Sequence, residues 1–316
     1  RGRRGARGGA RLRLVPTDLR RRLRRTPGRA PAAPLAAALL AASLGACTDA
    51  TPSLTGFADG EPTTGGRIAL SSCGYAVTSR EGATAPRPRE DRLGPDPRPF
   101  AVHLGLSGAA TRTINVVWRT RDEETLSSQV EFGEGEALDQ VVTGFSFAYE
   151  VPGRAPVRIH EAHLCGLKPG TRYSYRVGGR EGDRAVFSPT YSFRTAPDLR
   201  RNPGAKVLIA VLGDTRGGLA YFGQTLQRAQ AMGPPDLALF SGDATLLGFL
   251  QPEWDEYFAA AEPVLATVPM LAAHGNHEAN SVNYYSQFAL PGDEENYGLD
   301  YGAARVTVLN DSPADP

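Results

Sequence analysis

The sequence of 316 residues predicts a β-sandwich followed by an α/β domain. Short alternating stretches rich in Val, Ile, Tyr and Thr occupy residues 100–195 and are bounded by Gly or Pro, which is typical of a sandwich. After residue 205, continuous apolar stretches alternate with helical patterns, which is typical of parallel strands buried on both faces. Three of these stretches end in glycine followed by a side chain that can bind a metal.

The first 46 residues have the composition of an export signal. They hold 12 Arg and one Asp, and residues 30–46 carry no charge around a short apolar centre. A basic segment followed by a short apolar core and small residues is typical of secretory signals, and the core is too short to span a bilayer comfortably. The residues Leu-Gly-Ala before Cys47 resemble a bacterial lipobox, in which the cysteine is lipidated. We expect an exported cell-envelope lipoprotein held to the membrane at Cys47; the alternative is a buried Ala-rich helix with a chance cysteine.

Beyond residue 46 the chain is acidic, with 23 basic and 33 acidic residues. This excess of negative charge disfavours nucleic acid as a partner. Residues 47–98 are rich in Thr, Ser, Gly and Pro and predict a tether largely without regular structure, apart from one short strand at 74–77. An oxidising compartment would permit a disulfide between Cys73 and Cys165. Their spacing leaves open whether they pair or are two separate buried thiols.

The sandwich is predicted at residues 99–196. Its expected strands are 101–106, 113–119, 127–132, 157–163, 173–177 and 191–194. The stretch 167–177, Leu-Lys-Pro-Gly-Thr-Arg-Tyr-Ser-Tyr-Arg-Val, resembles the tyrosine-bearing corner of fibronectin type III domains. Trp118 on the second strand is expected in the core, and His103, His160 and His163 are expected to be structural.

The α/β domain is predicted at residues 204–316, after a polar linker. Strands are expected at 207–212, 237–241 and 270–273, helices at 221–231 and 253–267, and two further strands at 297–301 and 306–310. The first three strands precede Gly213-Asp214, Gly242-Asp243 and Gly275-Asn276-His277-Glu278.

The spacing of these motifs predicts that they meet. The ligands lie 29 and 33 residues apart, about the length of one βαβ unit. The carboxyl ends of parallel strands lie at one edge of a sheet, so carboxylate, amide and imidazole groups would converge there and suit a pair of metal ions. One Gly-Asp pair alone is weak evidence, because such an Asp often starts a turn or caps a helix. Three motifs at this spacing are far more specific.

The set resembles the calcineurin-like metallophosphoesterases, and the preceding sandwich resembles the purple acid phosphatase group within them. Residues 102–106, 116–120 and 296–310 are also similar to that group. The resemblance implies a four-layer αββα catalytic domain, of which the first half is present. It also implies metal-dependent hydrolysis of phosphate esters, most simply as an acid phosphatase-like phosphomonoesterase.

The resemblance assigns roles by position. Asp214 would bind one metal, Asp243 would bridge both and Asn276 would bind the second. A hydroxide between the metals would attack phosphorus in line, while His277 would contact phosphate and donate a proton to the leaving group. Glu278 would orient His277. The cofactors would be two metal ions, both divalent or one trivalent iron with one divalent ion.

Two positions depart from the family pattern. Leu246 stands where the purple enzymes have a tyrosine ligand, so the colour of a tyrosinate-iron centre is not expected. Arg216 stands where many metallophosphoesterases have a histidine ligand, and it would contact substrate phosphate or point to solvent. His274 is expected in the core. The family's remaining histidine ligands have no counterpart among the five histidines here, so we expect a truncated product that binds two metals poorly and has little activity.

Two other functions stay open at this point. The same metal core could serve a phosphodiesterase. A non-catalytic envelope protein would instead use the sandwich to bind a partner beside a degenerate α/β domain. Intact Asp214, Asp243, Asn276 and His277 argue against degeneration.

Overall fold

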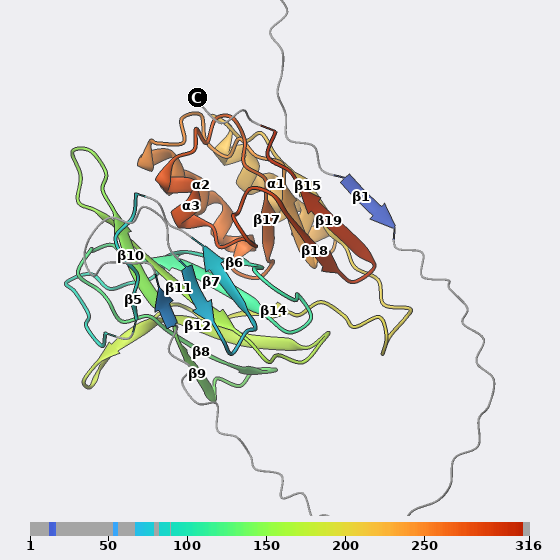
Figure 1. Ribbon diagram of the computed structural model, residues 1–316, viewed down its shortest axis with the longest axis horizontal. Coiled ribbons are helices and arrows are strands. Elements are labelled where there is room, and N and C mark those ends of the chain that lie inside the picture. Colours follow the sequence, from blue (N-terminus) through green and yellow to red (C-terminus); the bar gives the residue numbers. More distant parts are fainter. Residues whose placement is uncertain (1–12, 17–52, 56–66, 79–81, 89, 312–316) are drawn as a thin grey trace, which may run out of the picture.

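The structure, a computed structural model, describes residues 13–16, 53–55, 67–78, 82–88 and 90–311. A β-sandwich and a helix-bearing domain with parallel strands lie against each other (Figure 1). Cys47, the predicted lipidation site, lies outside the described residues. Four residues of the predicted signal segment form β1 (Arg13–Pro16), which pairs with β19 (Ala304–Val308). No helix in the described ranges is both long and apolar enough to cross a membrane.

The sandwich consists of two antiparallel sheets. The first contains, in spatial order, β6 (Phe100–Gly105), β7 (Ile114–Arg119), β11 (Val157–Leu164), β10 (Phe145–Tyr149) and β5 (Arg87–Pro88). The second contains β13 (Arg184–Phe187), β12 (Arg172–Glu181), β8 (Gln129–Glu134) and β9 (Gln140–Thr143), with β14 (Tyr191–Arg194) also paired to β12. Fully buried side chains such as Trp118 and Tyr175 form the core between the sheets.

Every strand predicted for the sandwich is present, with ends shifted by a few residues. The predicted corner is confirmed, because the Oη of Tyr173 accepts a hydrogen bond from the backbone N–H of Lys168 at 2.9 Å. Strands β5, β9, β10 and β13 were not predicted. All five residues of β10 are buried, so it lacks the alternation that marks a half-exposed strand.

The predicted tether is wrong for the part of residues 47–98 that the structure describes. There β2 (Ser53–Thr55), β3 (Arg67–Leu70) and β4 (Tyr75–Thr78) form a small antiparallel sheet, which confirms the one predicted strand and adds two. Apolar side chains of β3 and β4 pack against those of β10. A disulfide between Cys73 and Cys165, with Cα atoms 5.1 Å apart, fastens this sheet to the end of β11. Burial of apolar side chains and the disulfide stabilise this sheet, although its sequence is rich in residues that favour turns.

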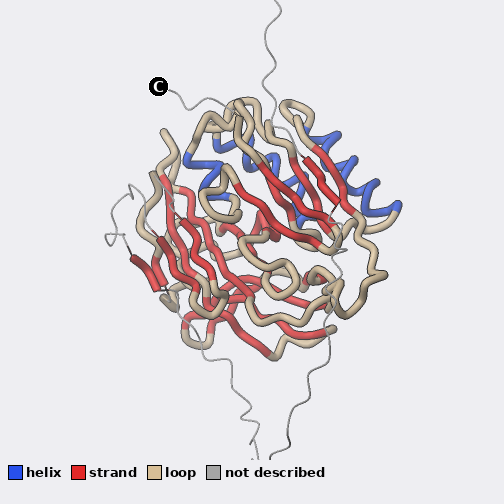
Figure 2. Tube along the Cα trace, turned by 45° about the vertical axis from the view of Figure 1, so that its right-hand side comes forward, coloured by secondary structure: helices blue, strands red, loops and turns tan. Residues whose placement is uncertain are grey.

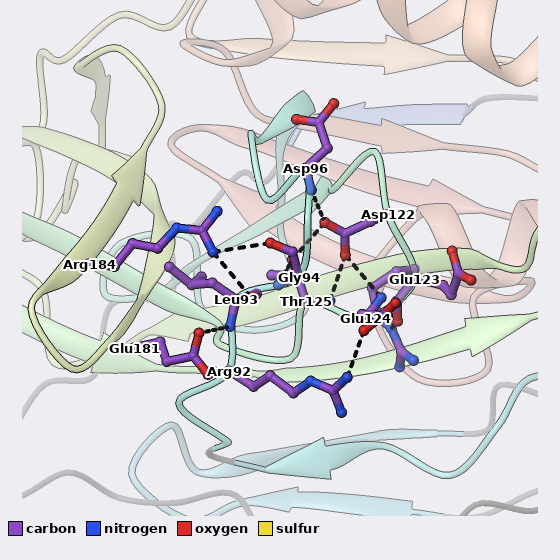
Figure 3. A network of polar contacts seen from close by, with 11 residues as sticks. Arg92, Leu93, Gly94, Asp96, Asp122, Glu123, Glu124, Thr125, Glu181 and Arg184 are labelled. Carbon is purple, nitrogen blue, oxygen red and sulfur yellow. Dashed lines mark hydrogen bonds and ion pairs between the residues drawn. The ribbon is translucent and has the colours of Figure 1, made fainter.

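The segment that leads into β6 is fastened by the carboxylate of Asp122 (Figure 3). This carboxylate accepts backbone N–H bonds from Asp96 at 2.7 Å, and from Glu124 and Thr125 in its own loop at 2.9 and 2.6 Å. Only glycine fits at Gly94, because a Cβ there would lie 2.4 Å from the Asp122 carboxylate. The segment before β6 is therefore held by these side-chain-to-backbone bonds in addition to the strand pairing of β6 itself.

The second domain has the predicted β-α-β-α-β order. Strands β15 (Ile209–Leu212), β16 (Leu237–Phe240) and β17 (Met270–Ala272) are parallel, and α1 (Leu219–Met232) and α2 (Gln251–Leu265) connect them. Only β16 and β17 are fully buried; β15 is an edge strand of the described sheet, with Val211 58% exposed. The helices gather at one end of the molecule (Figure 2). After β17 the chain continues into α3 (Val282–Gln287) and then into the hairpin of β18 (Tyr297–Tyr301) and β19.

The two domains share one sheet, which was not predicted. Met270 of β17 pairs with Gly105 of β6, so the three parallel strands continue into the first sheet of the sandwich. Hydrogen bonds from α2 strengthen the junction. Glu262 accepts from the backbone N–H of Ala101 at 2.9 Å and from the Oη of Tyr191 at 3.0 Å. The sandwich thus supports the scaffold from which the three motifs project.

Candidate metal centre

The loops after β15 and β16 lie side by side and adopt the same unusual backbone conformation. Asp214 and Asp243 have φ angles of 56° and 60°, in the left-handed region that few residues other than glycine adopt. The backbone N–H of Asp214 donates to the carbonyl of Gly242 at 3.0 Å, and the N–H of Thr215 donates to the carbonyl of Asp243 at 3.0 Å. Strained residues of this kind gather at functional sites, where the surroundings hold them in place.

Glu278 is the anchor of the site, not the orienting partner of His277 that the sequence suggested. Its buried carboxylate accepts backbone N–H bonds from Asp243 at 2.9 Å, Ala244 at 2.7 Å and Gly275 at 2.8 Å. The prediction is wrong because the carboxylate turns toward unpaired backbone donors, which need acceptors once they are buried. A glutamate that reaches back to an N–H three residues earlier has capping-box geometry, a signal that the motif itself carries. The pKa of the Glu278 carboxyl is raised, and burial is the main cause.

Close backbone approach explains the glycine of the third motif. A Cβ on Gly275 would lie 2.4 Å from the backbone nitrogen of Asp243 and 2.5 Å from the Glu278 carboxylate. Only glycine lets the loop after β17 lie against the loop after β16. The two loops therefore meet, as the sequence predicts, with Gly275 packed directly against Asp243.

Arg216 lies at the centre of the predicted ligands. Its Nε donates to the Oδ1 of Asp214 at 2.6 Å, and its Nη1 lies 3.5 Å from the Oδ2 of Asp243. The same Nη1 donates to the Nε2 of His277. Of the two predictions for Arg216, pointing to solvent is therefore wrong. The hydrogen bond to Asp214 is the main cause of a raised pKa for Arg216, so the guanidinium stays charged.

His277 is held from both sides of its ring. Its Nδ1 donates to the carbonyl of Leu246 at 2.6 Å, since a carbonyl can only accept, and this leaves Nε2 as the acceptor from Arg216. The backbone N–H of His277 donates to the Oδ1 of Asp243 at 3.1 Å. Asn276, the neighbouring predicted ligand, is exposed. The structure therefore brings Asp214, Asp243 and His277 together around one guanidinium.

The donor set fits part of a site for hard metal ions. Two carboxylates that share one cation lie close enough to share another, and carboxylate and amide oxygens are donors that such ions prefer. Within the described ranges, no group of three or more His, Cys, Asp or Glu side chains is gathered closely enough to hold a metal ion. The described ligands thus supply oxygen donors and one imidazole, with a guanidinium among them.

The other four histidines are structural, as predicted. His103 lies between the carbonyls of Ala101 and Gln287, while His160 contacts hydroxyls and stacks on Trp118. His163 contacts the Tyr75 hydroxyl and the Glu161 carboxylate. His274 is buried, and its Nε2 accepts from the backbone N–H of Asn280. All four lie in the core and point at protein groups.

Comparison with known proteins supports both domains. Residues 99–195 match the family described as purple acid phosphatase, N-terminal domain, and residues 207–312 match the calcineurin-like phosphoesterase family. Over 223 residues the chain is 30% identical to human acid phosphatase type 7, which covers 67% of this chain and 48% of the relative. Over 184 residues it is 30% identical to purple acid phosphatase 21 of Arabidopsis thaliana, covering 58% of this chain and 38% of the relative. A third relative, 32% identical, is a probable inactive purple acid phosphatase 1 of the same plant.

A solved structure has the same arrangement of domains. The purple acid phosphatase from yellow lupin (Lupinus luteus) seeds superposes with a TM-score of 0.53 at 21% identity, covering 66% of this chain and 44% of the lupin chain. The chain described here spans less than half the length of these relatives. The order of domains, the family matches and the shared fold agree. The chain belongs to the purple acid phosphatase-like metallophosphoesterases.

Proposed function

We propose that the chain takes part in metal-dependent hydrolysis of phosphate esters, with monoesters as the preferred substrates. One observation carries this proposal: the carboxylates of Asp214 and Asp243 share the guanidinium of Arg216, beside the imidazole of His277. Two negative groups placed this close need a cation between them. A phosphate ester needs the same cationic environment for the charge that develops during its hydrolysis.

Three side chains are proposed to hold the metals. Asp214 and Asp243 would contribute carboxylates from strained loops, and Asn276 would contribute an exposed amide oxygen. Two ions, both divalent or one trivalent iron with one divalent, would supply positive charge that polarises the phosphoryl group. The Glu278 carboxylate fixes the loops that carry Asp243 and Asn276, so their relative positions do not depend on the metals.

His277 is proposed to handle the proton of the leaving group. Its Nδ1–H is occupied by the Leu246 carbonyl, so Nε2 is the nitrogen that can take up a proton and pass it on. Arg216, which now donates to that nitrogen, is proposed to turn toward the phosphoryl oxygens, because a guanidinium binds phosphate in a forked geometry. In both roles a side chain that can carry positive charge lies beside the two aspartates, where the negatively charged phosphate would bind.

The test compares two substrates and two variants. With Mn²⁺ or Zn²⁺ supplied, we expect metal-dependent hydrolysis of p-nitrophenyl phosphate to exceed that of bis(p-nitrophenyl) phosphate. Asp243→Asn should lower this turnover by about a hundredfold, because metal-based charge stabilisation is worth several kcal/mol. The matched control, Asp300→Asn, removes an exposed carboxylate on β18 and should leave turnover unchanged.

Each alternative has its own outcome in this test. Faster diester than monoester hydrolysis would favour the phosphodiesterase. Complete absence of metal binding, in a chain that folds, would favour a non-catalytic envelope protein; weak turnover alone would not, because little activity is expected of this chain. Metal-dependent turnover that survives Asp243→Asn would remove Asp243 from the site.

We also propose export and attachment to the membrane through lipid on Cys47. The basic segment, the uncharged residues 30–46 and the lipobox-like residues before Cys47 support this. Expression in a bacterium with labelled palmitate should label the wild-type chain and leave Cys47→Ser unlabelled. Label on the Cys47→Ser chain, or none on either chain, would contradict the proposed anchor.

A further inference from the structure

The loop at residues 246–250, here called the apolar loop, exposes four large apolar side chains in a stretch of five residues. Leu246, Leu247, Phe249 and Leu250 are 48%, 41%, 57% and 38% exposed. Elsewhere in the described ranges, exposed large apolar side chains are scattered over β9, α1, the residues around β15 and the end of β19. A continuous exposed apolar patch on a soluble domain usually marks a binding surface.

The backbone of the apolar loop is held firmly, so its side chains are not exposed by disorder. The N–H groups of Leu246 and Leu247 both donate to the Oε2 of Glu253, at 2.5 and 3.2 Å. The carbonyl of Gly248 accepts from the indole N–H of Trp254 at 2.6 Å and from the Ser281 hydroxyl at 2.9 Å. These bonds fix the loop on α2 and on the segment before α3.

The apolar loop also borders the candidate site directly. It begins three residues after Asp243, and the carbonyl of Leu246 is the group that holds the Nδ1 of His277 at 2.6 Å. The N–H of Gly248 donates to the carbonyl of His277 at 2.8 Å. The residue proposed to protonate the leaving group is thus bonded twice to the loop that carries the apolar side chains.

We propose that the apolar loop binds the alcohol portion of the substrate, and so selects phosphate esters whose leaving group is aromatic or alkyl. This inference rests on the proposed function. The leaving-group oxygen must approach Nε2 of His277 to receive its proton. The apolar loop holds Nδ1 on the other side of the same ring, so an attached group that extends past the ring would meet the loop. An apolar leaving group would cover the exposed Leu and Phe side chains and remove their surfaces from water, which favours binding. A polar alcohol would gain no binding free energy from this contact.

The test separates phosphoryl binding from recognition of the apolar group. Phenylphosphonate and methylphosphonate carry the same charged head, and the first adds a ring. With Mn²⁺ present, calorimetric titration should give about tenfold tighter binding of phenylphosphonate to the wild-type chain. In the double variant Leu247→Ser/Phe249→Ser this preference should fall to about twofold or less, while methylphosphonate binds as before. The control Met232→Ser, an exposed apolar residue at the end of α1, should keep the tenfold preference.

The outcomes are distinguishable. A preference that persists in the double variant overturns the inference and leaves the proposed function standing. Equal binding of both phosphonates to the wild-type chain does the same, and assigns the apolar loop to another occupant. Failure of methylphosphonate to bind at all contradicts the phosphoryl site itself, and both proposals then fall together. Circular dichroism of each variant shows whether the loop substitutions leave the fold intact.

Discussion

The guanidinium of Arg216 donates to the carboxylate of Asp214 at 2.6 Å and stands among the side chains to which the sequence assigns metal ions. A positive side chain and a metal ion compete for the same oxygens. Arg216 places positive charge beside both aspartates, and a metal ion that binds the Oδ1 of Asp214 would have to displace it.

Removing this competitor should tighten metal binding. Arg216→Ala is expected to bind Mn²⁺ about two- to fivefold more tightly, since an exposed ion pair is worth up to about 1 kcal/mol. Isothermal calorimetry measures the change. Arg305→Ala breaks a comparable pair with Asp300 on the hairpin of β18 and β19, and it should leave the affinity unchanged. Weaker Mn²⁺ binding by Arg216→Ala would mean that Arg216 supports the metal site instead of competing for it.

A second prediction concerns the anchoring carboxylate. Glu278→Gln replaces one carboxylate oxygen with an NH₂ group, although both oxygens accept backbone N–H bonds. At least one buried donor then faces another donor, which should lower the free energy of unfolding by about 2 kcal/mol. Urea denaturation followed by circular dichroism measures this loss.

A matched control for that measurement lies in the first turn of α2, beside the apolar loop. Glu253 receives two backbone N–H bonds on a single oxygen, Oε2, so Glu253→Gln can keep both through its amide oxygen. We expect a change below about 0.5 kcal/mol for this half-exposed position at the surface. Equal losses for the two variants would show that the charge of Glu278, and not its two-oxygen geometry, holds the loops.

The contrast between Glu278 and the aspartates shows what the sequence could predict. Spacing alone brought Asp214 and Asp243 to one edge of the sheet, because parallel strands impose that edge on whatever follows them. The partners of Glu278 are backbone atoms of other segments, which have no signature in residue types. The left-handed conformation of both aspartates was equally invisible, since a Gly-Asp pair is compatible with several turns.

The fold shows the same division between local and distant information. The amphipathic helix α2 and the continuously apolar strand β16 follow from residue pattern. The pairing of Met270 with Gly105, which joins the domains into one sheet, depends on backbone contacts between segments 165 residues apart. The pairing of Cys73 with Cys165 depends on where β3 and β4 settle on the sandwich, so the cysteine spacing left it open.

The disulfide supplies a third prediction. It closes a loop of 92 residues, which in the chain-entropy model stabilises the folded state by about 4.6 kcal/mol. The double variant Cys73→Ser/Cys165→Ser should lose a comparable amount in urea denaturation. Added reductant should destabilise the wild-type chain and leave the double variant unchanged. A reductant effect on the double variant would place the sensitivity elsewhere in the chain.

The fourth prediction is a loss of stability in acid that arises from the core of the sandwich. His160 is fully buried between two hydroxyls and Trp118, and burial lowers its pKa to about 3. The pKa of His103 is likewise lowered, to about 4. Burial is the main cause, and it outweighs the contacts with two backbone carbonyls, which raise the pKa. In the unfolded chain both imidazoles titrate near 6.5.

The sign of this effect follows from the two protonation states. Above about pH 6.5 the histidines are neutral in the folded and unfolded chains, and they contribute no pH dependence. Between about pH 6.5 and pH 3–4 only the unfolded chain takes up these protons, so acidification favours unfolding by up to about 1.4 kcal/mol per pH unit for each histidine. Urea denaturation at pH 7.5, 6.0 and 5.0 should show this decline. His160→Gln keeps a polar side chain that cannot titrate, so its stability should fall less steeply over the same range, whatever its value at pH 7.5. Parallel declines for the variant and the wild-type chain would assign the acid sensitivity to other groups.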